Sequence, residues 1–373
     1  MDQIFKNSLL TIVASRSRKA SDGFLDNYMP CSTAFYFPVL HASGTLVTVT
    51  LQKVPDIHYA DEPINMRAWT LQERLLSPRT LSFLSKGATL EWQCESAWES
   101  NIGPIEKPFG EKLRLYSQIF PRRGSAPLPL ARHRLCHLWA GIVEDYSARD
   151  LTYSEDKLLA ISAVAQEFAR IFGTGYYAGL WRSILVPQLL WKSVYPLSKP
   201  NTRADTYRSP SWSWASIVGR VDLCPFPCLS DSKLNVLDCK VALADNNAPF
   251  GAVASAILTV QGALKKATVH ICTLYDSVTG EVLALASLDT RVSIGHNPVW
   301  CLLVMTESSV DWDVETLTSQ TSQDYPDTLC ALLLTKAQSN QKVAFQRVGI
   351  TNEFPEPNLH WFDDATVKVI DII

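Results

Sequence analysis

The sequence lacks the local signatures of several common enzyme classes. It contains no Gly-x-Gly-x-x-Gly pattern and no phosphate-cradling loop, and Gly173-Thr-Gly175 is expected to end a helix instead. No Gly-x-Ser-x-Gly elbow is present either. These absences exclude the standard nucleotide-binding loops and the nucleophile of an α/β hydrolase.

Long apolar runs and an excess of either charge are also missing. No apolar stretch approaches the roughly 20 residues that a membrane span needs, and the N-terminus shows no basic-then-apolar signal pattern. The formal net charge of −3 argues against a basic surface for nucleic acid or anionic membrane. With 47% apolar and 19% charged residues, we expect a globular, cytoplasmic protein that binds no nucleic acid.

The nine cysteines are odd in number and scattered along the chain. Several of them, such as Cys301 and Cys330, lie inside apolar runs that resemble strands. This distribution favours buried free thiols in a reducing compartment over a disulfide framework.

Two short groupings could in principle bind a metal. His133 and His137 stand at i, i+4 with Cys136 between them, and Cys224-Pro-Phe-Pro-Cys228 brings two thiols close together. Neither grouping has a second ligand pair at a suitable spacing. A helix edge and a loop are therefore the favoured interpretations, and no metal is predicted.

The most informative stretch runs from Asn65 to Arg79. Wound at about 100° per residue, it gathers its apolar side chains into one arc. That arc consists of Ala68, Trp69, Leu71, Leu75 and Leu76. Gln72 falls inside the arc, and Glu73 stands at its edge, one turn beyond Trp69. A buried amide needs hydrogen-bond partners and such a carboxylate needs a cation, a donor or a chemical role, so the pattern predicts a half-buried helix with a polar rim.

Other patterns predict the remaining elements. Polarity alternates over residues 80–84 and 89–94, which indicates a β-hairpin. Residues 135–146 and 152–172 carry apolar stripes at helical spacing, and Thr152 with Glu155 fits a capping box at the start of the second. Beyond residue 216 the chain is rich in strand-like runs, and a segment rich in proline, glycine and basic residues, 103–129, is expected to separate two parts.

Three motifs carry a resemblance to a known family. Residues 67–83 read Arg-Ala-Trp-Thr-Leu-Gln-Glu-Arg-Leu-Leu-Ser-Pro-Arg-Thr-Leu-Ser-Phe, and residues 90–94 read Leu-Glu-Trp-Gln-Cys. Together with Arg-Ser-Pro-Ser-Trp-Ser-Trp-Ala-Ser over residues 208–216, they resemble the fungal heterokaryon-incompatibility (HET) domain and the region that follows it. Residues 146–165 and 178–181 look like the helical region behind that domain. The Tyr-Cys-Trp-Gly and Trp-Ile-Asp motifs that begin the family's domain are not found, so we expect only its C-terminal half.

The resemblance implies a fold and a set of regions. The expected fold class is α+β, with a partial HET lobe that is TIR-like and α/β, a helical middle and a β-rich C-terminal lobe. The corresponding regions are residues 1–105, 106–208 and 209–373. The interpretation also implies an extended segment in which Trp212 and Trp214 face the same side.

The resemblance further implies candidate site residues. In TIR enzymes that cleave NAD, a glutamate on the corresponding helix stabilises an oxocarbenium-like transition state, which makes Glu73 the candidate catalytic residue. The candidate binding residues are Arg67, Trp69, Arg74, Arg79, Trp92, Trp212 and Trp214. The alternative is structural: Glu73 pairs with Arg67, Arg74 or Arg79, and the tryptophans are core and anchor residues.

Two functions follow from the resemblance. The first is fungal heterokaryon incompatibility, in which the chain takes part in non-self recognition and programmed cell death through contacts with other HET-type or incompatibility proteins. The second is a HET-derived scaffold recruited to secondary metabolism as an enzyme or accessory protein that holds a small molecule. No cofactor is expected, and NAD enters only as a candidate substrate.

Overall fold

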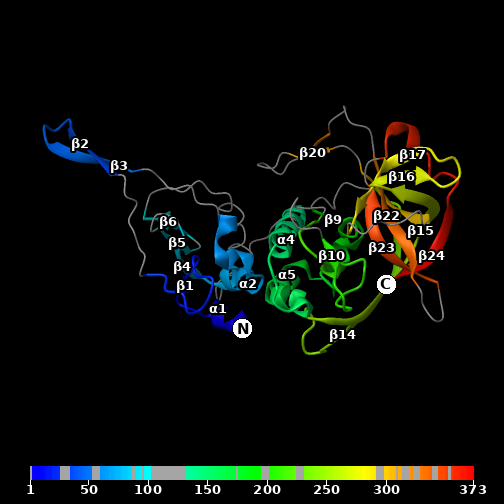
Figure 1. Ribbon diagram of the computed structural model, residues 1–373, viewed down its shortest axis with the longest axis horizontal. Coiled ribbons are helices and arrows are strands. Elements are labelled where there is room, and N and C mark those ends of the chain that lie inside the picture. Colours follow the sequence, from blue (N-terminus) through cyan, green and yellow to red (C-terminus); the bar gives the residue numbers. More distant parts are fainter. Residues whose placement is uncertain are drawn as a thin grey trace. The chain divides into compact units, whose positions relative to one another are not determined.

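The computed structural model describes the chain in a series of segments. They are residues 2–25, 34–52, 59–85, 89–94, 96–101, 132–173, 175–194, 201–223, 231–290, 298–307, 310–312, 319–321, 328–337, 343–351 and 354–373. The chain forms two compact units, Met1–Leu128 and Pro129–Ile373 (Figure 1). Helices and strands occur in both, so the chain has the predicted α+β class. Within the described segments, no helix is both long and apolar enough to cross a membrane.

The first unit contains a four-stranded sheet ordered β1-β4-β5-β6. Its strands are β1 (Thr11–Val13), β4 (Arg79–Phe83), β5 (Leu90–Cys94) and β6 (Trp98–Ser100). β1 pairs with β4 in parallel, and the other neighbours are antiparallel. The β4–β5 pairing confirms the predicted hairpin.

Short helices accompany this sheet. They are α1 (Asp2–Lys6), η1 (Tyr59–Asp61), η2 (Pro63–Met66) and α2 (Trp69–Leu76). The α-helix is therefore shorter than the predicted stretch, because Arg67 is extended between η2 and α2. It ends at Leu76, and the next residue, Ser77, is extended, as expected for a residue that precedes a proline.

A separate two-stranded hairpin also belongs to the first unit. It consists of β2 (Ala34–Leu40) and β3 (Leu46–Gln52), which pair antiparallel from Ala34 opposite Gln52 to Leu40 opposite Leu46.

The second unit begins with helices. They are α4 (Arg132–Ser147), η3 (Ser154–Lys157), η4 (Leu159–Ile161), α5 (Ser162–Phe172), η5 (Arg182–Ile184) and α6 (Leu185–Gln188). The apolar stripe predicted over residues 135–146 is buried in α4, where its members are Leu135, Leu138, Ile142 and Tyr146. α5 ends at Gly173, which adopts the left-handed conformation with φ of +58°.

The capping box predicted at Thr152 and Glu155 is wrong. Two 3-10 turns precede α5, which begins only at Ser162, and no side chain caps either turn. The carbonyl oxygens of Ser154 and Lys157 accept hydrogen bonds from Arg208 Nη1 (3.1 Å) and the Tyr146 hydroxyl (2.5 Å). In an α-helix these two carbonyls would accept hydrogen bonds from backbone amides four residues further along the chain, but here side chains from elsewhere in the unit donate to them.

Short strands connect the helical part to the rest of the second unit. They are β7 (Tyr176–Tyr177), β8 (Leu180–Trp181), β9 (Lys192–Ser193), β10 (Thr202–Arg203), β11 (Ile217–Val218) and β12 (Val221–Asp222). The segment around Trp212 is not extended as predicted. It turns at Ser213, whose hydroxyl accepts from the Ala215 amide and caps the 3-10 helix η6 (Trp214–Ser216).

The β-rich part is built on one large sheet. Its strands are β13 (Asp231–Ser232), β14 (Asn235–Leu243), β15 (Val253–His270), β16 (Thr273–Asp276), β17 (Val282–Leu285), β18 (Ser287–Leu288), β19 (Pro298–Glu307), β22 (Thr328–Ala337), β23 (Ala344–Thr351) and β24 (Thr366–Ile372). A short hairpin, β20 (Val310–Trp312) with β21 (Ser319–Thr321), and the 3-10 helix η7 (Glu356–Asn358) complete the elements. Strands dominate this part of the chain, as the strand-like runs beyond residue 216 predicted.

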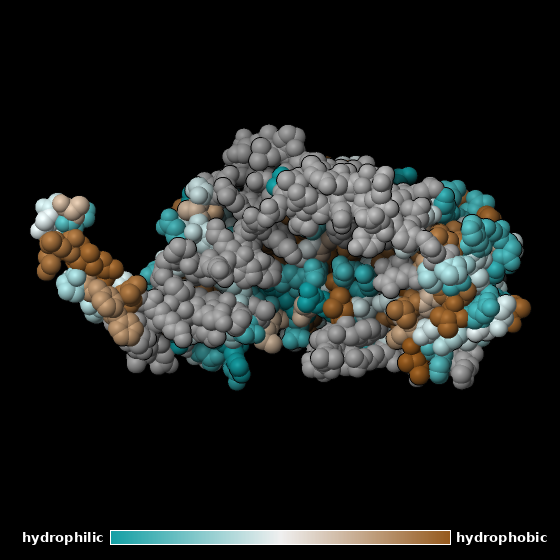
Figure 2. All heavy atoms as spheres, turned by 90° about the horizontal axis from the view of Figure 1, so that it is seen from above, coloured by the Kyte–Doolittle hydropathy of each residue, from teal (hydrophilic) through white to brown (hydrophobic). Residues whose placement is uncertain are grey.

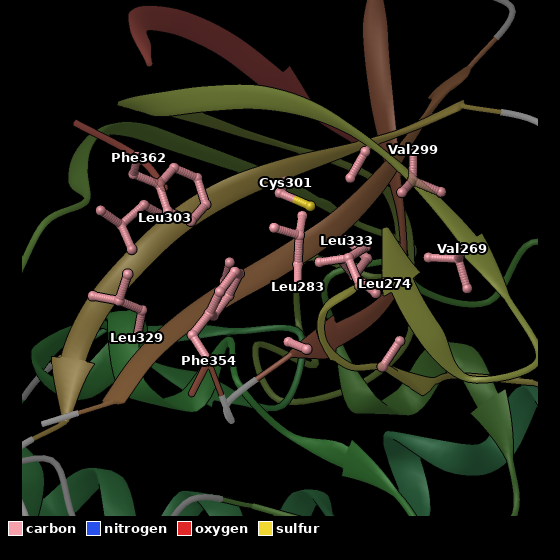
Figure 3. Close-up of a cluster of buried hydrophobic side chains, with 14 of the residues drawn as sticks. Val269, Leu274, Leu283, Val299, Cys301, Leu303, Leu329, Leu333, Phe354 and Phe362 are labelled. Carbon is pink, nitrogen blue, oxygen red and sulfur yellow. The ribbon is translucent and has the colours of Figure 1, made fainter. Parts of the chain in front are cut away.

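Five strands of this sheet close into a ring, in the order β19-β22-β23-β24-β15 and back to β19. The long strand β15 makes the closure because it pairs with β24 along one stretch and with β19 along another. A cluster of buried apolar side chains packs on these strands (Figure 3), among them Cys301 and Leu303 of β19 and Leu333 of β22, together with Phe354 and Phe362.

A buried ionic cluster joins the helical part to the ring. Arg347 of β23 is wholly buried, and its guanidinium donates to the Leu189 carbonyl (2.7 Å), the Trp191 carbonyl and Asp289 Oδ1 (3.0 Å). The guanidinium carbon lies 3.4 Å from the centre of the Trp191 ring. Arg203 donates to the other oxygen of Asp289 at 3.2 Å. Residues 129–373 therefore form one body.

Candidate functional site

The predicted site residues of the first unit are organised by α2. The helix has little polar capping at its start, but the Thr70 hydroxyl contacts the carbonyls of Ile64 (2.5 Å) and Arg67 (2.7 Å) and fixes the entering turn. Its predicted apolar arc is buried except for Trp69, which is half-buried. Gln72 is buried, as the arc predicted.

Glu73 stands at the edge of this arc and is half-buried. Burial raises the pKa of its carboxyl, and the positive charge of Arg67 opposes that shift. Glu73 and Trp69 share one side of the helix because they are four residues apart. The structure thus brings Glu73, Trp69 and Arg67 into one neighbourhood at the helix edge.

The two other arginines of the predicted set point to different partners. Arg79 donates through Nη1 to the Leu9 carbonyl at 3.3 Å. Arg74 reaches from α2 to Glu91 of β5, with 3.3 Å between Nη2 and Oε1. Both are therefore engaged by partners other than Glu73.

Glu91 is the centre of a buried polar cluster that the sequence did not reveal. Its side chain is wholly buried, and the Tyr59 hydroxyl donates to Oε2 while Arg74 donates to Oε1. Burial and the Glu91 carboxylate raise the pKa of Tyr59, so the phenol remains protonated and keeps donating. The Trp98 ring packs edge-on against Tyr59, with 6.4 Å between ring centres.

The sheet face that carries Glu91 is polar and yet covered. Thr80 and Ser82 of β4 are buried, and Ser82 lies opposite Glu91 in the register. Because Arg74 reaches Glu91 from α2, this is the face on which the helix lies. Side chains alternate along a strand, so Trp92 points to the opposite face, away from Glu91.

Several oxygens of this polar layer have no hydrogen-bond partner among the described residues. They are Gln72 Oε1, Thr80 Oγ1, Ser82 Oγ and Gln93 Oε1. A buried oxygen left unpaired costs about 1–3 kcal/mol. Among the described residues, the layer beneath α2 therefore holds four buried oxygens that are not used in hydrogen bonds.

A second buried carboxylate links two segments of the first unit. The buried Glu62 accepts hydrogen bonds from the Ser85 amide (3.0 Å to Oε1) and the Ser85 hydroxyl (2.8 Å to Oε2). It fixes the end of β4 to the segment that leads into α2. Its role is structural, because both of its oxygens are engaged by Ser85.

Replacement of Glu91 by alanine is expected to destabilise the β4–β5 hairpin by about 3 kcal/mol, because Arg74 and the Tyr59 hydroxyl would lose a buried charged acceptor. Amide hydrogen exchange measures this directly, and the amides of β4 and β5 should exchange about 100-fold faster. Glu99→Ala on the exposed face of β6 is the matched control and should leave the exchange rates unchanged. Equal effects of the two substitutions would show that Glu91 contributes nothing through this cluster.

The two predicted tryptophans of the second unit are core residues. Trp212 and Trp214 are wholly buried. The Trp212 carbonyl accepts from Trp191 Nε1 (2.9 Å), and Trp214 Nε1 donates to the Gly179 carbonyl (3.0 Å). With no exposed ring face, neither can stack a ligand at the surface.

The candidate metal groupings gain no support from the described part of the chain. Within it, no group of three or more potential ligands lies close enough to hold a metal ion. Cys136 is buried and His137 is half-buried, while the side chain of His133 and the Cys224–Cys228 pair lie outside the described residues.

A cleft of about 400 Å³ opens in the second unit between the region of α6 and β14. Its lining combines Arg182, Ser183 and Asp238 with apolar side chains such as Leu185. Cys239 also lines it, but burial and the Asp238 charge raise the pKa of the thiol to about 12. The thiol is therefore protonated at neutral pH and is a poor nucleophile.

Comparison with protein-family models, with curated proteins and with solved structures finds no match to this chain.

Proposed function

We propose that this chain is a HET-like cytoplasmic protein of fungal non-self recognition that acts through protein contacts. Two observations support the proposal. The motif resemblance centres on α2 and the β4–β5 hairpin, and the first unit also carries an exposed apolar surface. The exposed apolar surface is the reason for proposing a function through protein contacts and not through catalysis.

That surface is the β2–β3 hairpin. Every residue from 35 to 51 is exposed, and the segment contains no lysine, arginine, aspartate or glutamate. Its large apolar side chains are exposed by between 40% (Val47) and 70% (Leu46). Figure 2 shows the hairpin as a brown, hydrophobic surface.

One face of the hairpin is entirely apolar. The register places Phe35 opposite Leu51, Phe37 opposite Val49, and Val39 opposite Val47, so these six side chains share a face. A contiguous exposed apolar surface of this kind marks a site of protein contact. An isolated hairpin is also marginally stable, which favours a partner that extends its sheet or packs against it.

The surroundings of Glu73, the predicted catalytic residue, support catalysis less well than the hairpin supports protein contacts. Glu73 lies at a helix edge beside Arg67, while Arg74 and Arg79 are engaged by other partners and Trp92 lies on the far side of the sheet. The predicted set therefore does not converge around Glu73. A role of Glu73 in local structure fits this arrangement better than a role in cleaving NAD.

Overexpression in a fungal host tests the proposal. We expect wild-type protein to arrest growth, Val49→Lys to abolish the arrest, and Glu73→Ala to retain it. The lysine introduces a charge into the apolar face, whereas the alanine removes only the carboxylate at the helix edge. Ser43→Lys, in the exposed turn of the same hairpin, is the matched control and should behave as wild type at equal protein level.

The opposite pattern would overturn the protein-contact function. If Glu73→Ala abolished the arrest and Val49→Lys did not, Glu73 would act chemically. Release of nicotinamide from NAD by the purified protein, lost in Glu73→Gln, would then assign the hydrolase activity that the TIR resemblance implies.

The second candidate is a HET-derived enzyme or accessory protein of secondary metabolism. It is favoured by the cleft beside α6, whose volume and mixed lining suit a small polar molecule. The buried aromatic rings of the second unit do not contribute to it.

A further inference from the structure

The two outer edges of the β2–β3 hairpin differ in their hydrogen-bonding capacity. Among the described residues, β2 and β3 pair only with each other, so both outer edges lack a neighbouring strand. Such edges are templates for pairing with another chain unless charge, proline or a bulge blocks them. The hairpin offers no charge for this purpose.

The register identifies which backbone groups point outward. At the turn, the His41 amide donates to the Thr45 carbonyl at 2.8 Å, which makes this a hydrogen-bonded pair. Such pairs alternate along an antiparallel ladder, so Leu40 with Leu46 and Pro38 with Thr48 are non-hydrogen-bonded pairs. The backbone nitrogens of these residues therefore face outward.

The outer edge of β2 is blocked and that of β3 is open. Pro38 has no N–H, so β2 lacks a donor at the middle of its outer edge. On β3 the outward residues are Leu46, Thr48 and Thr50, all of which carry an N–H and a C=O. β3 can thus accept a complete additional strand.

We propose that β3 pairs antiparallel with β3 of a second copy of this chain, about a two-fold axis through Thr48. This inference rests on the proposed function, since it names the partner of the same hairpin. Thr48 then exchanges both of its outward hydrogen bonds with Thr48 of the second copy. Val47 lies opposite Val49 of the other strand, and Leu46 lies opposite Thr50.

The sequence of β3 suits pairing with β3 of a second copy. It reads Leu-Val-Thr-Val-Thr-Leu-Gln, so the two-fold register sets β-branched residues opposite one another in its central pairs, Thr48 with Thr48 and Val47 with Val49, which stabilises sheets. Because β3 carries no charged side chain, pairing with a second copy brings no like charges together. The pairing also turns two marginal hairpins into one four-stranded sheet and joins their apolar faces.

Measurement of the mass of the full chain by analytical ultracentrifugation at micromolar concentrations tests the pairing. Wild-type protein should be a dimer, and Thr48→Pro should raise the dissociation constant at least about tenfold by removing the central outward donor. The substitution spares the hairpin itself, because the Thr48 N–H is not used in the β2–β3 ladder. Tyr36→Pro is the matched control: it removes an outward donor from the blocked edge of β2, so the dimer should persist.

Three results would overturn the proposal: a monomeric wild type, an equally stable dimer of Thr48→Pro, or equal losses in the two proline variants. The proposed function has a separate readout. If wild-type protein were monomeric while growth arrest still required Val49, the hairpin would bind a different protein, and only the self-pairing would be excluded. If the dimer formed as expected while Val49→Lys still arrested growth, the recognition function would be excluded instead.

Discussion

Replacement of Arg347 by methionine is expected to destabilise the second unit by about 3–5 kcal/mol. Methionine keeps an apolar side chain of similar length but leaves the buried Asp289 with only Arg203 as a cationic partner. It also leaves the carbonyls of Leu189 and Trp191 without the donors that they have now. Urea denaturation followed by tryptophan fluorescence measures the effect, because eight of the eleven tryptophans lie within residues 129–373.

The control for Arg347 is an ion pair at the surface. Lys240 lies 3.4 Å from Asp238, and the two side chains are 80% and 52% exposed. Lys240→Met should change the free energy of unfolding by no more than about 0.5 kcal/mol. A loss for Arg347→Met as small as this would mean that the cluster does not hold the helical part to the ring.

Replacement of Gly179 by alanine is expected to cost about 3 kcal/mol or more, from backbone strain and a steric clash together. The glycine has a φ of +101°, which L side chains rarely adopt. An added Cβ would lie 2.6 Å from Nε1 and 2.9 Å from Cε2 of Trp214. That ring is wholly buried and cannot move aside without disturbing its surroundings. Thermal unfolding of the purified protein measures the loss.

Gly280→Ala separates the contribution of backbone strain from that of the steric clash. Gly280 has a φ of +74°, but an added Cβ would meet nothing within 4 Å. Its substitution should cost about 1 kcal/mol, from strain alone. If Gly179→Ala cost no more than Gly280→Ala, the contact with Trp214 would not constrain this position.

Periodic patterns in short segments correctly predicted those helices and strands whose conformation depends mainly on the residues within the segment itself. The stripe of α4 and the alternation of the β4–β5 hairpin are properties of short segments, and they appear in the structure as expected. Thr152 shows the limit of this reasoning. The capping box is a local pattern, but Tyr146 of the preceding helix α4 and Arg208, which is distant in sequence, bind the carbonyls of the turns around Lys157.

The centre of the candidate site was missed for a related reason. Alternation along β5 separates Glu91 from Trp92 correctly, but it does not say which face the helix will cover. An apolar face is normally the covered one, yet here α2 lies on the face of Thr80, Ser82 and Glu91. Arg74, a cation on the flank of the predicted helix, could be recognised as a partner for a carboxylate, but no local pattern identified Glu91 as that carboxylate.

The closure of the ring has a consequence for synthesis on the ribosome. Leu258 of β15 is paired with Ile372 of β24, so one side of β15 waits for a strand translated more than a hundred residues later. At bacterial or eukaryotic elongation rates this delay is on the order of 10 s. During that interval the nascent chain presents an unsatisfied β15 edge, which makes this strand the natural site for a chaperone to protect.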